Sequence, residues 1–223
     1  MISRLPKWVE LGAFVLALVA GVVNAIALLG FEHQAVSHLS GTATLLGTHL
    51  TNPSSALLHL VLLLVSFVAG SVVAGALLHG ATLKLGRHYD TALLLEAALL
   101  LVALGLLYFG SYHGHYFASA ACGLQNALAT TYSGAIVRTT HMTGIFTDLG
   151  IMLGARWRGE PFDRRKAQLF LLIISGFIGG GALGAWLFRE YHFMTLLLPI
   201  GVCLGLAFLY RVYLVEQRFD STE

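Results

Sequence analysis

Two ten-residue stretches decide the fold: HLSGTATLLG at residues 38–47 and HMTGIFTDLG at residues 141–150. Both are polar, and both lie between long apolar runs. In each of them a hydroxyl residue and a glycine precede an apolar-periodic segment, at residues 42–51 in the first copy and 145–155 in the second. A Ser or Thr in this position is typical of a helix N-cap. Each stretch therefore predicts a short, polar-capped helix.

The predicted helices are too short to cross a membrane. A helix of about 11 residues rises about 17 Å, roughly half the thickness of the hydrocarbon core. We therefore expect two half-helices, re-entrant or interfacial, whose N-termini point inward. Free backbone N–H groups at that depth are tolerated only where they face protein or a wet cavity.

The composition around these stretches indicates a membrane protein. Hydrophobic residues make up 57% of the 223 residues, charged residues only 11%, and the mean hydropathy is +0.79. About a quarter of an ordinary soluble chain is charged. Six apolar runs have the length of about 20 residues that a membrane span needs; they cover residues 9–30, 56–79, 91–110, 116–137, 168–188 and 194–213. We expect an all-α polytopic membrane protein with six transmembrane helices and no attached soluble domain.

The two polar stretches belong to a longer internal repeat. With one residue of slack the matched pairs are Gly21 and Gly123, Asn24 and Asn126, Ala25 and Ala127, His38 and His141, Ser40 and Thr143, Gly41 and Gly144, Thr44 and Thr147, and Gly47 and Gly150. The match continues from FVAGSVVAGAL at residues 67–77 to FIGGGALGAWL at residues 177–187. The chain is therefore interpreted as two three-span repeats, residues 1–112 and 113–223, in a single membrane domain.

An odd number of spans in each repeat predicts that the two repeats are inverted relative to each other. The positive-inside rule is an independent test of this orientation. The loops predicted to be cytoplasmic contain Arg4, Lys7, Lys84, Arg87, Arg138, Arg156, Arg158, Arg164, Arg165, Lys166, Arg211 and Arg218, whereas the opposite face has Arg189. This bias predicts that both termini are cytoplasmic.

Inverted repeats with broken helices are typical of secondary transporters, in which the positive end of a half-helix holds an anionic group of the substrate. The predicted substrate-binding residues are Asn24, His38, Ser40, Gly41, Thr44, Asn126, His141, Thr143, Gly144 and Thr147. For any single hydroxyl among them, close helix packing is an equal alternative. Both histidines are expected to be neutral, because the helix dipole disfavours an imidazolium at a helix start.

The two asparagines lie near the middle of predicted spans, where an amide needs hydrogen-bond partners. One interpretation is a hydrogen bond between helices, with Asn24 bound to Asn126 across the pseudo-two-fold axis. The other is coordination of a solute or an ion.

Two acidic residues within the apolar regions also need an explanation, because acids in a membrane are costly and are usually paired or proton-linked. Asp148 stands where the first repeat has Leu45. It is either a coupling acid for protons or Na⁺, or the ion-pair partner of Arg138 or Arg156. Glu96 lies about one turn inside the third span and is expected to snorkel towards Lys84 or Arg87.

Other features predict packing and lipid contact. Small residues recur at four-residue intervals at Ser66, Gly70 and Ala74 and at Gly176, Gly180 and Gly184. These stripes join either the two repeats or two protomers of a homodimer. The basic segment RWRGEPFDRRK at residues 156–166 is expected to meet anionic lipid headgroups rather than nucleic acid. Cys122 and Cys203 are interpreted as packing residues, and the sequence has neither an HExxH nor a CxxC metal motif, so no metal or cofactor is expected.

The motifs AGVVNA at residues 20–25, GLQNA at 123–127 and TTHMTGIFTDLG at 139–150 resemble the YoaK-like family of bacterial integral membrane proteins, a domain of unknown function. The resemblance covers nearly the whole chain. It implies six spans and a location in the bacterial inner membrane. Family members often have an Asn-containing TGN in the first motif, where this chain has Ser40, Gly41 and Thr42.

These observations favour a secondary transporter or permease for a small polar or anionic solute, and not an enzyme. A passive channel built on the same motifs is the closest alternative. An intramembrane enzyme acting on lipid would use His38 or His141 as a base, but no convincing nucleophile accompanies them. A scaffold protein is a third alternative, and it would pack the polar motifs dry.

Overall fold

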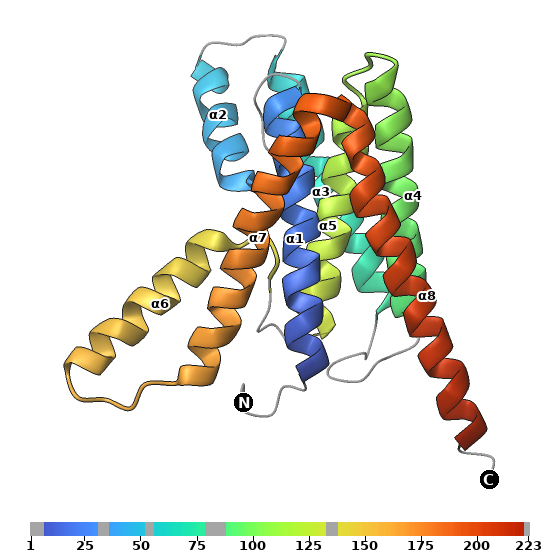
Figure 1. The fold of residues 1–223 in the computed structure, drawn as a ribbon. Coiled ribbons are helices and arrows are strands. Elements are labelled where there is room, and N and C mark those ends of the chain that lie inside the picture. Colours follow the sequence, from blue (N-terminus) through green and yellow to red (C-terminus); the bar gives the residue numbers. More distant parts are fainter. Residues whose placement is uncertain (1–6, 31–35, 52–55, 79–87, 133–137, 221–223) are drawn as a thin grey trace.

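The computed structural model describes residues 7–30, 36–51, 56–78, 88–132 and 138–220, and these residues form helices and connecting turns without a strand. The helices are α1 (Lys7–Gly30), α2 (Leu39–Thr51), α3 (Ala56–Leu77), α4 (Tyr89–Tyr108), α5 (Gly114–Tyr132), α6 (Met142–Trp157), α7 (Arg164–Tyr191), the 3₁₀-helix η2 (His192–Leu196) and α8 (Leu197–Asp220) (Figure 1). The predicted all-α fold is confirmed. Arg4, Lys84, Arg87 and residues 133–137 of the fourth predicted span lie outside the described residues.

Four stretches of the described chain are long and apolar enough to cross a membrane. They are Glu10–Gly30, Ala56–Leu77, Tyr89–Tyr108 and Arg164–Leu214, the last of which continues from α7 through η2 into α8. Helix α5 is not among them, because its sequence contains His115, Gln125 and Asn126 as well as several hydroxyl residues. The chain is thus a helical protein of the membrane type, and α5 is a long helix whose polar residues keep it outside these four stretches.

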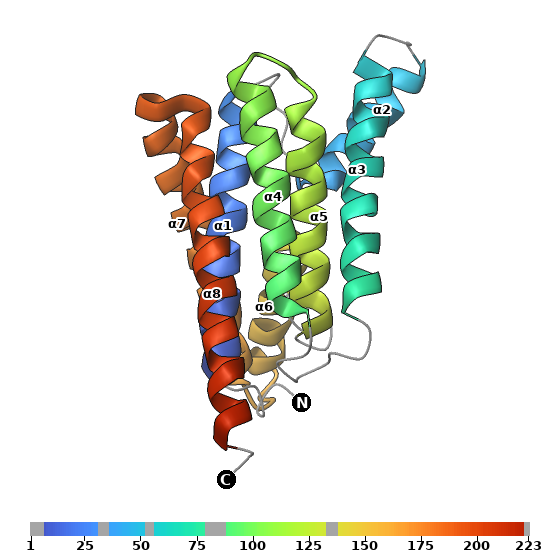
Figure 2. The same ribbon diagram turned by 90° about the vertical axis from the view of Figure 1, so that its right-hand side faces the viewer.

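The long helices run in two opposite directions. In Figure 1, α1, α4 and α7 run upward, and α3, α5 and α8 run downward. The short helices α2 and α6 both begin near mid-height, but α2 runs upward and α6 downward. Figure 2 shows α4 and α5 in the middle of the bundle, with α7 and α8 on one side of them and α2 and α3 on the other.

Helices α1 and α7 are in backbone contact along a seam of glycines. A Cβ atom added to Gly21 would collide with the carbonyl oxygen of Phe177 and would lie 2.8 Å from the nitrogen of Gly181. A Cβ atom added to Gly180 would collide with the carbonyl of Leu18 in the same way. Small residues allow two helices to approach this closely, and any side chain at these positions would separate them.

Helices α3 and α5 form a second seam with the same pattern at the matched positions of the repeat. A Cβ atom on Gly123 would collide with the carbonyl of Phe67, and one on Gly70 with the carbonyl of Ala120. Each seam therefore joins the first long helix of one half of the chain to the second long helix of the other half.

The seams account for much of the two predicted small-residue stripes. Gly70, Ala74, Gly176, Gly180 and Gly184 are buried within one chain. The stripes were expected to join either the two repeats or two protomers. These residues join the two repeats of one chain. Dimerisation itself stays a prediction.

The expectation for Glu96 is wrong. Its side chain does not snorkel to a surface but is 2% exposed, in the interior beside α5 and α8. One of its carboxyl oxygens is buried and has no hydrogen-bond partner in the described part of the chain. The reason is that α4 packs against both α5 and α8, which cover this face of α4. Cys122 and Cys203 are also buried, as expected for packing residues.

Candidate functional site

The two short helices begin directly after the two matched histidines. Helix α2 starts at Leu39 and α6 at Met142, three residues before the predicted starts. The carbonyl of His38 already accepts hydrogen bonds from the backbone of Gly41 and Thr42, at 3.0 and 3.3 Å.

The predicted capping by Ser40 and Thr143 is therefore wrong. Both residues lie inside the first helical turn, and the N-cap of α6 is His141, which makes no side-chain capping bond. Because no side chain caps α6, the backbone N–H groups of its first turn remain available to another acceptor.

A cavity of about 590 Å³ lies where the two helix starts meet α3 and α5. We call it the central cavity. Its lining consists of Ser37, His38, Leu39, Ser40, Phe67, Ser71, Asn126, Ala127, Thr130, Thr131, Arg138, Thr140, His141, Met142 and Thr143. Residues about a hundred positions apart in the sequence thus share one cavity, most of whose lining residues carry a polar side chain.

Five of the predicted binding residues line the central cavity: His38, Ser40, Asn126, His141 and Thr143. Burial lowers the pKa of His38 from its ordinary value of 6.5, which favours the neutral ring at pH 7. The ring of His38 also packs edge-on against Phe177, with the centroids 5.9 Å apart.

Four other predicted residues do not line the cavity. Thr44 and Thr147 donate their hydroxyl hydrogen bonds back to the carbonyls of Ser40 and Thr143 in their own helices, both at 2.9 Å. Gly41 is exposed. Gly144 lies directly under the ring of His141, so that an added Cβ atom would collide with this ring.

Asn24 does not line the cavity either, because its amide is occupied. The side-chain nitrogen donates to the carbonyl of Ala20, at 3.0 Å, and to the hydroxyl of Ser37, and the side-chain oxygen accepts from the backbone N–H of Ser37, at 3.2 Å. Asn24 thus fixes the segment that leads into α2. The suggested hydrogen bond between the two asparagines is wrong, because Ser37 takes the place of Asn126.

Asn126 differs from its counterpart. It lines the central cavity, and its side-chain oxygen is buried without a hydrogen-bond partner among the described residues. In the alignment of the repeats, Thr140 is the counterpart of Ser37, and Thr140 also lines the cavity. In the first half, Ser37 donates a hydrogen bond to the side-chain oxygen of Asn24. At the matched place in the second half, the side-chain oxygen of Asn126 has no such partner among the described residues. Buried polar atoms without partners are rare in proteins and often mark sites where a ligand binds.

Arg138 is the functional candidate that the sequence interpretation missed. From the sequence it is one of the cytoplasmic cations and one of two alternative ion-pair partners for Asp148, whereas in the structure it lines the central cavity. It is the one charged side chain in the described lining, and no acidic residue in the described part of the chain forms an ion pair with it. The available signal was its position, as a lone cation three residues before the second polar stretch.

Asp148 lies outside the cavity lining. Its carboxylate is 47% exposed and lies 3.7 Å from the ammonium group of Lys166 on α7. The predicted pairing with Arg138 or Arg156 is therefore wrong. The register of α6 against α7 places the lysine, rather than either arginine, opposite this acid.

An all-helical bundle of the membrane type, with a polar cavity at the meeting point of two short helix starts, defines the class of this protein. Residues 12–209 match the family described as "Protein of unknown function (DUF1275)", and the chain belongs to that family. No curated protein and no solved structure matches the chain. The expected membership of a family of unknown function is confirmed, whereas the YoaK-like name remains a resemblance.

Proposed function

We propose that the chain crosses a bacterial inner membrane six times, as two inverted three-span repeats with both termini in the cytoplasm. The opposite directions of the matched helices support this arrangement (Figure 1). The two glycine seams support it further, because matched residues make matched contacts in both. In this arrangement α5 crosses the membrane inside the bundle, where α3 and α4 shield its polar residues from lipid.

We expect cysteines at the far ends of the two short helices to react from opposite sides of the membrane. Thr51 ends α2 and Arg158 follows α6, and both are exposed. A membrane-impermeant maleimide should label Thr51→Cys on intact cells, and Arg158→Cys only after permeabilisation. The native cysteines are buried and should give little background. Labelling of both variants from the same side would contradict the inverted arrangement.

Within this arrangement we propose that the protein is a secondary permease for a small anionic solute. The observation that carries the proposal is the central cavity, which both helix starts line together with Arg138, a cation that has no ion-pair partner among the described residues. Helix N-termini and a guanidinium group together favour an anion. The side-chain oxygen of Asn126 needs a hydrogen-bond donor, so the preferred solute also carries an O–H or N–H group.

Transport can be measured in proteoliposomes with malate and succinate, two dicarboxylates that differ by one hydroxyl group. We expect faster uptake of malate, and accumulation above equilibrium when a proton gradient is imposed. Arg138→Gln should reduce uptake roughly tenfold or more, since a hydrogen bond to a charged group contributes about 1.5–3 kcal/mol.

Arg189→Gln is the matched control, because this exposed arginine lies in the last turn of α7, away from the cavity. Uptake that only equilibrates, whatever the gradient, would indicate a passive channel instead of a permease. Equal losses in the two arginine variants would exclude Arg138 as a solute-binding residue.

A further inference from the structure

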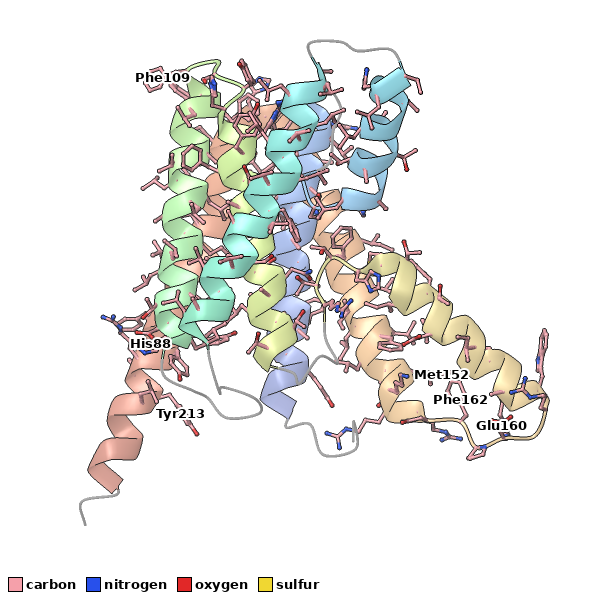
Figure 3. All side chains as sticks on the ribbon, turned by 180° about the vertical axis from the view of Figure 1, so that it is seen from behind. His88, Phe109, Met152, Glu160, Phe162 and Tyr213 are labelled. Atoms are coloured by element: carbon pink, nitrogen blue, oxygen red, sulfur yellow. The ribbon has the colours of Figure 1, made fainter. Side chains whose placement is uncertain are left out.

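The corner between α6 and α7 contains a second cavity, which shares no lining residue with the central cavity. Its volume is about 360 Å³, and it is lined by Leu153, Arg156, Phe162 and Arg164. Figure 3 shows Phe162 between the two helices and Glu160 in the turn that joins them. This corner contains the basic segment of residues 156–166.

The two arginines of this cavity differ from the other cations of the segment. Five cations and two acids lie between residues 156 and 166. Ion pairs join Arg158 to Glu160, Arg165 to Glu10 and Lys166 to Asp148, at 2.9, 3.2 and 3.7 Å. Asp163 accepts a hydrogen bond from the backbone of Lys166 at the start of α7.

Arg156 and Arg164 are thus left without an ion pair among the residues that the structure describes. They come from the last turn of one helix and the first residue of the next, and they line the same cavity. Two guanidinium groups beside one cavity suit the oxygens of a phosphate group. The other two lining residues, Leu153 and Phe162, are apolar and suit hydrocarbon rather than a fully hydrated anion.

One exposed face of α6 also points to lipid. Phe146, Leu153 and Trp157 share this face because they are spaced seven and four residues apart on the helix, and all three are exposed, with Trp157 92% exposed at the end of the helix. Tryptophan is enriched at the boundary between lipid headgroups and hydrocarbon. The cavity therefore lies where a phospholipid headgroup and its acyl chain would both find matching surfaces.

We propose that the cavity lined by Arg156 and Arg164 binds the headgroup of an anionic phospholipid, whose acyl chain lies along the exposed apolar face of α6. This inference rests on the membrane placement proposed above, but not on transport. Loss of transport activity would leave it unaffected, because its readout is lipid binding.

The test compares lipid binding to the purified full-length protein by native mass spectrometry, with phosphatidylglycerol and phosphatidylcholine as probes. Wild-type protein should retain phosphatidylglycerol preferentially. Arg156→Gln/Arg164→Gln should bind it roughly tenfold or more weakly, because both guanidinium groups that line the cavity are removed. The control Arg158→Gln/Arg189→Gln removes the same net charge outside the cavity and should bind phosphatidylglycerol as tightly as wild type.

Equal losses in both double variants would mean diffuse attraction to surface charge and would overturn the site, as would no loss in either. Displacement of the lipid by millimolar inorganic phosphate would identify free phosphate as the ligand and would also overturn it. Arg156→Lys/Arg164→Lys keeps both charges. Retained binding in this pair supports the site even if the glutamine pair fails to fold, and lost binding in a folded lysine pair contradicts recognition by charge.

Discussion

Gly180→Ala is expected to lower the free energy of unfolding by about 2 to 3 kcal/mol, whereas Gly179→Ala, one residue away, should leave it unchanged or raise it by up to about 1 kcal/mol. The added methyl group at position 180 would collide with the backbone of Leu18 on α1, and α1 and α7 would have to separate. At position 179 the added methyl group would meet no heavy atom of another described helix within 4 Å. Both substitutions bring the same change in helix propensity, so their difference isolates the contact. Unfolding in mixed detergent micelles, followed by circular dichroism, measures it.

The second seam offers the same comparison within α3. Gly70→Ala would meet the backbone of Ala120 and should destabilise the protein to a similar extent, whereas Gly75→Ala has open space around it. Similar effects of the two substitutions in either pair would contradict the backbone contact at that seam. Because the seams share no residues, the losses from Gly70→Ala and Gly180→Ala should also add in the double variant.

Leucine substitution of the two matched asparagines is expected to affect different properties. Asn24→Leu should lower the stability of the protein, and Asn126→Leu should lower its transport rate. Asn24→Leu leaves the N–H and the hydroxyl of Ser37 without their partner, which should cost about 1 to 3 kcal/mol. Asn126→Leu removes an amide oxygen that has no hydrogen-bond partner among the described residues, so the free energy of unfolding should change by less than about 1 kcal/mol. Malate uptake by the folded Asn126→Leu protein should nevertheless fall roughly tenfold, because the solute loses a hydrogen bond.

These two variants need both measurements on the same preparation, namely unfolding in micelles and uptake in proteoliposomes. A large loss of stability in Asn126→Leu would assign Asn126 a packing role. Unchanged uptake in the same variant would remove it from the solute site. The value of the pair is that each asparagine is the control for the other, at equivalent positions of the repeat.

The helices could largely be predicted from the sequence, because apolar runs of about 20 residues have few other folds. The predicted starts of the two short helices were less accurate. The prediction treated Ser40 and Thr143 as caps, yet both helices begin just after His38 and His141. A Ser or Thr near a helix start is compatible with either register, and only the backbone hydrogen bonds distinguish them.

About half of the predicted binding residues line the cavity, and the failures have a common cause. The sequence repeat shows which residues the two halves have in common. It does not show which of the two copies forms its side-chain hydrogen bonds within the chain. The side-chain oxygen of Asn24 accepts a hydrogen bond from Ser37, while that of Asn126 has no such partner in the part of the chain that the structure describes. Arg138 was missed because it has no counterpart in the repeat, and its approach to α5 depends on tertiary packing.

The pairing of α1 with α7 has a consequence for biosynthesis. Helix α1 leaves the ribosome long before α7, its partner in the first glycine seam. The surface of α1 that later contacts α7 must therefore face lipid or the insertion machinery while most of the chain is made. The interval between the synthesis of α3 and that of α5 is much shorter. We therefore infer that the α3–α5 pair assembles first and that the α1–α7 pair closes last, which makes the synthesis of the chain from Arg164 onward the step that commits it to its native form.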